Sequence, residues 1–76
     1  MAVSIYTTPS CSYCRVAKDY FRKSGISFSE YDISADPRLA EEMMRKSGQF
    51  GVPVIDINGR VIVGFNQVAI ERALHR

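Results

Sequence analysis

The sequence predicts an α/β domain in which three helices pack on a four-stranded mixed sheet, in the order β-α-β-α-β-β-α. Two observations favour this fold class. Segments rich in β-branched and aromatic residues alternate with segments whose apolar residues recur at helical spacing. Toward the end of the chain, Asn58-Gly59 joins two β-rich runs and is a strong signal for a hairpin with a type I′ turn. Short loops connect all these elements, so we expect a single domain over residues 1–76.

The first half of the chain is expected to form a strand, a helix and a second strand. Val3–Thr7 is β-rich, and a helical pattern runs from Cys14 until Ser24-Gly25 ends it. Ile26–Ile33 has the composition of a strand, although its apolar positions change phase within the run. Because a helix connects these two strands, we expect them to be parallel, with a right-handed crossover.

The second half begins with another helix, for which Asp36-Pro37 supplies an N-cap and a proline at the first helical position. Gly48 ends that helix. The hairpin strands are expected at Val52–Ile57 and Arg60–Val63, and they must be antiparallel. A short helix with Asn66 as its N-cap closes the predicted order.

Charge and hydropathy exclude several function classes. Ten Lys+Arg against eight Asp+Glu leave a net charge of +2, and the basic residues are scattered, so we expect no nucleic-acid partner. No apolar stretch approaches the roughly 18 residues of a membrane span, so we expect no membrane association. The opening Met1-Ala2-Val3-Ser4 lacks the charged and apolar regions of a signal peptide, which predicts a cytoplasmic protein.

The two cysteines form a C-x-x-C motif between the first strand and the first helix. The N–H groups and dipole at a helix N-terminus favour a thiolate, so Cys11 should titrate below the free-thiol pKa of about 8.5. Cys14 lies one turn later, where it can attack a sulfur bonded to Cys11. The pair therefore suits two-step exchange, in which Cys11 attacks a target disulfide and Cys14 resolves the mixed disulfide. Their own disulfide would close too short a loop to stabilise the fold much.

A structural zinc site is the main alternative for this motif. Such sites use four ligands, and the chain offers Cys11, Cys14 and His75, so a carboxylate or a partner would have to supply the fourth. A second alternative is a pair of merely buried cysteines, which the position at a helix start argues against. We therefore expect redox chemistry and no metal.

The dipeptide Val52-Pro53 is a second unusual feature, because proline donates no hydrogen bond within a sheet. It is either a proline at a strand entry or a cis proline. A cis bond would turn the Val52 backbone outward beside the cysteines. Its N–H and C=O could then pair with an extended substrate segment by strand addition.

Together these features resemble the glutaredoxin family of the thioredoxin superfamily, over nearly the whole chain from Val3 to about Ala73. The specificity lies in the conjunction of motifs, because no single one would suffice. The residues that carry the resemblance are Ile5-Tyr6-Thr7, Cys11-Ser12-Tyr13-Cys14, Gly25, Gly51-Val52-Pro53-Val54, Asn58-Gly59 and Val63-Gly64-Phe65.

This resemblance implies a thioredoxin fold and a monomeric thiol–disulfide oxidoreductase, with Cys11 as nucleophile, Cys14 as resolving thiol and Pro53 as the cis proline. Its substrates would be protein disulfides or glutathione mixed disulfides. It would hold no cofactor permanently, and glutathione would be a co-substrate. The residues expected to contact substrate are Thr8, Tyr13, Val52, Pro53, Gly64, Phe65 and Asn66.

The departures from the family pattern concern the electron source. Many glutaredoxins have Lys or Arg at the position of Thr8, Thr at that of Gly51, and acidic residues where this chain has Asn66 and Gln67. Those residues hold the charged ends of glutathione. Gly64-Phe65 instead resembles the glutaredoxin-like hydrogen donors of ribonucleotide reductase, which draw electrons from thioredoxin reductase. The donor is therefore open between glutathione and thioredoxin reductase, and ribonucleotide reductase is one candidate target.

Ser12 supports a second hypothesis of a different class, because the commonest dithiol motif of the family has Pro at that position. Family members with Ser or Gly there can hold an iron–sulfur cluster between two protomers, through the first cysteine of each and two glutathione thiols. The alternative function is thus a cluster carrier that dimerises through Cys11. The weakened contacts for glutathione argue against it.

Overall fold

A computed structural model describes residues 2–75 and, for His75, the backbone alone. It confirms the predicted α/β class and the β-α-β-α-β-β-α order. The elements are β1 (Val3–Thr7), α1 (Ser12–Lys23), β2 (Ser29–Asp32), α2 (Pro37–Ser47), β3 (Val54–Ile57), β4 (Arg60–Val63) and α3 (Gln67–His75). None of the helices in the described residues has the length and apolar character needed to span a membrane.

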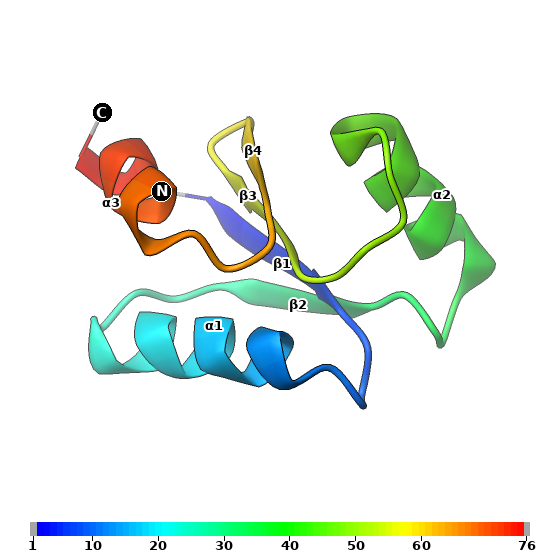
Figure 1. Cartoon of the computed structure of the whole chain (residues 1–76), viewed down its shortest axis with the longest axis horizontal. Helices are drawn as coiled ribbons and strands as arrows, with labels where there is room; N and C mark the ends of the chain where they lie inside the picture. Colours follow the sequence, from blue (N-terminus) through cyan, green and yellow to red (C-terminus); the bar gives the residue numbers. More distant parts are fainter. Residues whose placement is uncertain (1, 76) are drawn as a thin grey trace.

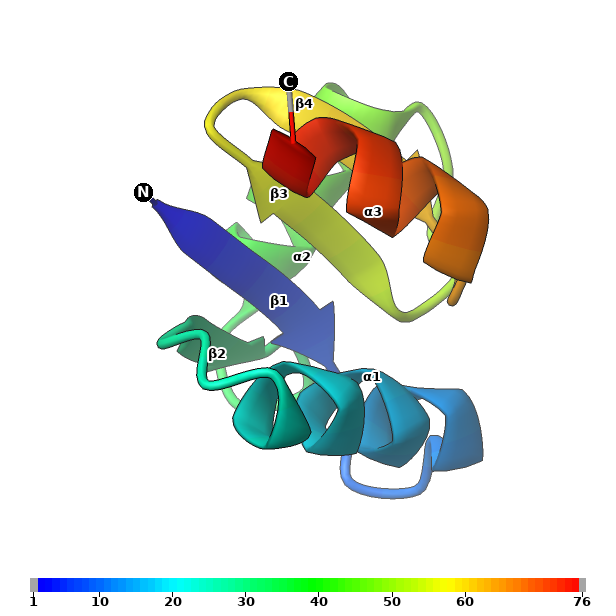
Figure 2. The ribbon, with the colours of Figure 1, turned by 90° about the vertical axis from the view of Figure 1, so that its left-hand side faces the viewer.

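The strands form one mixed sheet in the order β2-β1-β3-β4 (Figures 1 and 2). As expected, β1 and β2 are parallel, whereas β3 and β4 are antiparallel. β1 and β3 are also antiparallel, with Tyr6 opposite Val54. Because of this register, the residues that follow β1 and those that precede β3 meet at the same end of the sheet.

Helices cover both faces of the sheet, α1 and α3 on one side and α2 on the other (Figure 2). Alternate residues of each strand point to opposite faces, so Ile5 faces α1 and α3 while Tyr6 faces α2. The larger cluster of buried residues lies under α1 and α3 and comprises Val3, Ile5, Ala17, Phe21, Ile55, Ile57, Ile62, Ile70 and Ala73. The smaller cluster, under α2, consists of Tyr6, Met43 and Val54.

The second strand is shorter than predicted, Ser29–Asp32 rather than Ile26–Ile33, and the end of α1 explains why it does not begin at Ile26. The N–H groups of Gly25 and Ile26 donate to the carbonyls of Arg22 and Phe21, at 3.1 and 2.9 Å. With Gly25 at φ 70°, these bonds form a Schellman motif, which reverses the chain. Ile26 therefore packs against the core as part of the helix end. The apolar positions change phase because Ile26 and Phe28 pack on the cluster under α1 and α3, whereas Tyr31 and Ile33 pack on the cluster under α2.

Other boundaries also differ by a few residues. Helix α1 begins at Ser12 rather than at Cys14, because Cys11 already serves as its N-cap. β3 begins at Val54, two residues later than expected, since Pro53 has no N–H to donate within the sheet. The predicted cap of α2 is confirmed, because an Asp36 carboxylate oxygen accepts from the N–H of Arg38 at 2.9 Å.

The hairpin between β3 and β4 has the geometry that its sequence predicts. Asn58 and Gly59 both have left-handed backbones, with φ of 52° and 91°, as a type I′ turn requires. The Asp56 carboxylate accepts from the N–H of Gly59 at 2.8 Å, which closes the turn further. The turn aligns β4 so that Gly64 follows it at the same end of the sheet as Pro53.

Candidate active site

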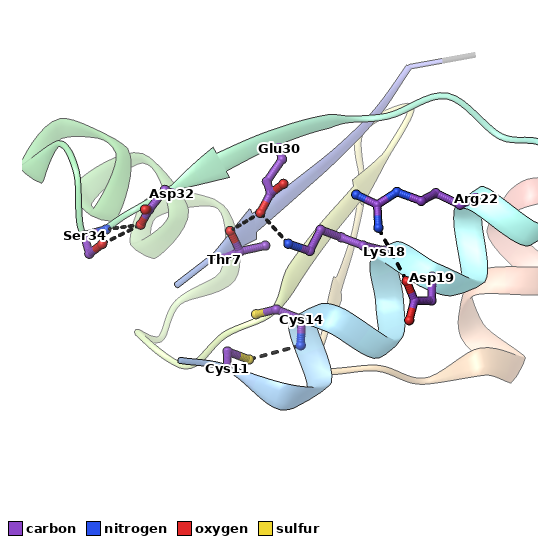
Figure 3. Close-up of polar contacts among 9 residues, drawn as sticks. All are labelled: Thr7, Cys11, Cys14, Lys18, Asp19, Arg22, Glu30, Asp32 and Ser34. Atoms are coloured by element: carbon purple, nitrogen blue, oxygen red, sulfur yellow. Dashed lines mark hydrogen bonds and ion pairs between the residues drawn. The ribbon is translucent and has the colours of Figure 1, made fainter. Parts of the chain in front are cut away.

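Cys11 is the N-cap of α1, with an extended backbone at φ −92° and ψ 112°. Its Sγ accepts a hydrogen bond from the backbone N–H of Cys14 at 3.1 Å (Figure 3). In an ordinary cap, an oxygen of Ser, Thr, Asp or Asn takes this position. The local fold thus gives the sulfur of Cys11 one of the N–H groups that a helix leaves unpaired at its start.

The two sulfurs differ in their surroundings. Cys11 is half-buried, whereas Cys14 is 1% exposed. Burial raises the pKa of the Cys14 thiol to about 12, and its hydrogen bond with Cys11 adds to the rise. A backbone hydrogen bond from Thr8 and the charge of Lys18 act in the opposite direction. At neutral pH, Cys14 is therefore a protonated thiol directly behind the more accessible Cys11.

The Val52-Pro53 peptide bond is cis, as one of the two interpretations predicts. Pro53 is fully buried, and its carbonyl accepts from the N–H of Gly64 at 2.8 Å. Neither backbone group of Val52 has a hydrogen-bond partner among the described residues. The register of β1 and β3 brings this dipeptide to the end of the sheet where the chain continues from Thr8 to Cys11.

The loop before Val52 is closed by a side chain that the sequence did not single out. The Gln49 amide accepts from the N–H of Gly51 at 2.6 Å and donates to its carbonyl at 3.1 Å. A Cβ atom at Gly51 would lie 2.7 Å from the Gln49 Oε1, so glycine allows this close approach. The N–H and C=O of Gly51 are thus both bonded to Gln49, whereas the backbone groups of Val52 are available to a substrate.

The remaining predicted site residues have varied surroundings. Tyr13 is 65% exposed. Phe65 packs on the core through the ring of Tyr20, with ring centroids 5.7 Å apart. Asn66 caps α3 as predicted, because its Oδ1 accepts from the N–H of Ala69 at 3.1 Å. Phe65 and Asn66 thus have structural contacts besides any role toward a substrate.

A polar cluster beside Cys14 was missed by the sequence reasoning. The Lys18 Nζ lies 2.9 Å from the Glu30 carboxylate, which also accepts from the Thr7 hydroxyl at 3.0 Å (Figure 3). The hydrogen bond from Lys18 holds the pKa of Glu30 below its usual range. The spacing of Cys14 and Lys18, one helical turn apart, was the available signal, but the strand partner was not evident.

The zinc site considered as an alternative has no cluster of ligands in the part of the chain that the structure describes. No group of three or more His, Cys, Asp or Glu side chains close enough to hold a metal ion occurs there. The side chain of His75, the third ligand considered, lies outside the described residues.

The C-x-x-C motif lies at a helix N-terminus, at the same end of the mixed sheet as a cis proline. This combination is typical of redox proteins with a thioredoxin fold. The family model for glutaredoxin matches residues 3–62. One curated relative is an uncharacterized glutaredoxin-like 8.6 kDa protein of a Clostridium pasteurianum rubredoxin operon, 39% identical over 97% of this chain and 99% of its own length. Another is Escherichia coli glutaredoxin 3, 40% identical over 82% of this chain and 75% of its own length. The chain belongs to the glutaredoxin family, whose members are thiol–disulfide oxidoreductases.

Among solved structures, the Escherichia coli glutaredoxin-like protein NrdH-redoxin, described as having a thioredoxin-like activity profile, superimposes with a TM-score of 0.85 at 28% identity. The match covers 95% of this chain and 93% of that protein. This similarity, together with the glutaredoxin relatives, supports the expected thioredoxin fold over almost the full length of the described residues.

Proposed function

We propose that this protein reduces disulfides by a dithiol mechanism in which Cys11 is the nucleophile and Cys14 the resolving thiol. The observation that carries the proposal is the N-cap geometry, in which the Cys14 N–H donates to the Cys11 Sγ at 3.1 Å. It places a half-buried sulfur at the helix start and a buried thiol behind it. Only the first of these sulfurs is presented to a bulky disulfide.

The reaction has two exchange steps. The Cys11 thiolate attacks one sulfur of the target disulfide, forms a mixed disulfide and releases the other target sulfur as a thiolate, which takes up a proton. Cys14 then loses its proton and attacks the Cys11 Sγ. This step forms the Cys11–Cys14 disulfide and releases the second target thiol. Two electrons have passed from the cysteine pair to the target, and an external donor must restore the dithiol.

Substrate binding is proposed to use the open backbone of Val52. An extended segment on either side of a target cysteine can pair with the Val52 N–H and C=O in the manner of an added strand. Such pairing recognises main chain rather than particular side chains. It therefore suits both a glutathionyl group and a protein disulfide as substrate.

The electron donor is proposed to be thioredoxin reductase, with glutathione as the competing source. The support is the absence of charge at Thr8 and Asn66, since these positions offer no ion pair to the charged ends of glutathione. The Asn66 side-chain oxygen is also engaged in capping α3. The similarity to a protein with a thioredoxin-like activity profile points the same way.

A coupled assay tests both parts of this proposal. Insulin disulfides serve as substrate, and NADPH oxidation is followed with thioredoxin reductase alone or with glutathione and glutathione reductase. Wild-type protein should turn over with thioredoxin reductase faster than with the glutathione system, and Cys11→Ser should be inactive with both. Faster turnover with glutathione would reverse the donor assignment. Full activity of Cys11→Ser would contradict the dithiol mechanism itself.

A further inference from the structure

The proposed second step has an unfavourable requirement, because Cys14 must lose a proton while it is buried. The Cys14 side chain is 1% exposed, and removal of water disfavours its charged form. The hydrogen bond with Cys11 disappears once Cys11 is bonded to a target, but the burial remains. A nearby positive charge would offset this cost if it were held close to the sulfur.

Lys18 satisfies this geometric condition. It follows Cys14 by four residues in α1, so the two side chains lie on the same face of the helix, about 5–6 Å apart at their Cβ atoms. In Figure 3 the Lys18 ammonium points toward β1 and β2, on the side of α1 from which the Cys14 sulfur projects. The side chain of Lys18 is only 22% exposed, so water screens its charge incompletely.

Two residues from the sheet hold this ammonium in place. Glu30 of β2 accepts from the Lys18 Nζ at 2.9 Å, and the same carboxylate oxygen accepts from the Thr7 hydroxyl at 3.0 Å. Thr7, at the end of β1, is 1% exposed, which makes it a rigid anchor for the Glu30 carboxylate. Lys18 thus differs from a freely solvated lysine, because it is bound to Glu30, and Glu30 is in turn bound to the buried hydroxyl of Thr7.

We propose that Lys18, held by Glu30 and Thr7, is a positioning residue for the second exchange step, where its charge stabilises the Cys14 thiolate that attacks the mixed disulfide. This inference rests on the proposed dithiol function. Lys18 keeps its proton throughout. The proton of Cys14 leaves to water or to the departing target thiolate, and the new bond is the Cys11–Cys14 disulfide.

The charged and titratable groups around this site are few. On α1, Cys11 and Lys18 act on Cys14, whereas Arg22 acts on Glu30. β2 contributes the Glu30 carboxylate, which faces Lys18, and β1 contributes only the uncharged Thr7 hydroxyl. Lys18 is therefore the cation among the described residues that acts on the Cys14 sulfur.

The expected effect on rate is moderate. An opposite charge within about 4–6 Å lowers an acid pKa by about 1–3 units, and partial exposure with the facing Glu30 puts Lys18 at the lower end of that range. Losing about one unit leaves about tenfold less thiolate at neutral pH. The remaining thiolate is about threefold more nucleophilic, so the second step should slow by about threefold.

The test uses the full-length protein and the neutral disulfide 2,2′-dithiodipyridine in a stopped-flow spectrometer. One pyridinethione is released when Cys11 attacks and a second when Cys14 resolves, so the two steps are observed separately. In Lys18→Met we expect the second phase to slow by about threefold at pH 7, with its rising pH profile moved to higher pH and the first phase unchanged. Lys18→Arg should keep the wild-type second phase.

The matched control is Lys23→Met, which removes the same charge from an exposed position of the same helix and should leave both phases unchanged. Lys18→Gln replaces Lys18→Met if that variant does not fold. A Lys18 variant whose second phase matches wild type in rate and pH profile would overturn the inference, as would an equal slowing in Lys23→Met. A wild-type protein with no second phase, or a second phase in Cys14→Ser, would instead overturn the dithiol function.

Discussion

At the residue scale, one helix start produces two different thiols. Cys11 is the cap and its sulfur accepts a hydrogen bond from a backbone N–H, whereas Cys14 lies one turn inside the helix and is buried. Burial raises the pKa of Cys14 to about 12, so it stays protonated far above the pH at which an exposed thiol ionises. The three-residue spacing of the motif is thus sufficient to separate an accessible thiol from a protected one.

This difference predicts selective alkylation of the reduced protein. At pH 8, a thiol with a pKa of about 12 is ionised to only about one part in ten thousand, so iodoacetamide should modify Cys11 and spare Cys14. Labelling of Cys14 should rise with pH toward 12. Intact-mass spectrometry measures this as one added group per chain at pH 8, located by fragmentation.

The single-cysteine variants provide the control for this experiment. Cys14→Ser should react at the wild-type rate and Cys11→Ser much more slowly, although each retains one thiol. Equal labelling rates for the two variants at pH 8 would contradict the difference in environment.

The sequence indicates those residues of the candidate site whose signals are local. Cys11 and Cys14 were evident from their spacing at a helix start, and Pro53 from its position at the beginning of a strand. Lys18 and Glu30 were not evident, since they meet only when α1 packs on β2 in a particular register. Contacts of this kind depend on tertiary geometry that no local pattern encodes.

At the element scale, α2 packs on the sheet through a single fully buried side chain among the described residues. Met43 is the buried residue of α2, at 0% exposure, whereas its neighbour Met44 is 40% exposed. Lys46 also connects α2 to the sheet. Its Nζ lies 2.9 Å from both the Tyr6 hydroxyl and the Asp56 carboxylate.

These two adjacent methionines give a matched pair of substitutions. Met43→Ala removes a fully buried side chain and should lower the free energy of unfolding by about 2–5 kcal/mol. Met44→Ala should change it by no more than about 0.5 kcal/mol, as an exposed substitution does. Urea denaturation followed by circular dichroism measures both. Similar losses for the two variants would contradict the described packing of α2.

Element boundaries were the least predictable part of the fold. The Asp36 cap and the Asn58-Gly59 turn were predicted, because each depends on a few neighbouring residues. The start of β2 was not predicted, because an apolar residue such as Ile26 is expected both in a strand and at the end of a helix with a Schellman motif. Composition alone does not distinguish a residue that extends a sheet from one that packs a helix end.

At the scale of the whole molecule, sheet topology assembles the site. β1 leads into Cys11, and antiparallel pairing of β1 with β3 brings the cis Val52-Pro53 dipeptide to the same end. The bond between Pro53 and Gly64 adds the segment after β4. The strand order was not part of the sequence prediction, because a hairpin and a crossover leave open which strands become neighbours.

The proposed roles, in which Cys11 attacks a disulfide and Cys14 resolves the product, can be tested by trapping the intermediate. Insulin is mixed with the reduced wild-type, Cys14→Ser and Cys11→Ser proteins, and the products are acid-quenched and weighed by non-reducing intact-mass spectrometry. We expect Cys14→Ser to accumulate an adduct through Cys11 that dithiothreitol removes, while the other two proteins accumulate none. An adduct formed by Cys11→Ser through Cys14, or none formed by Cys14→Ser, would contradict these roles.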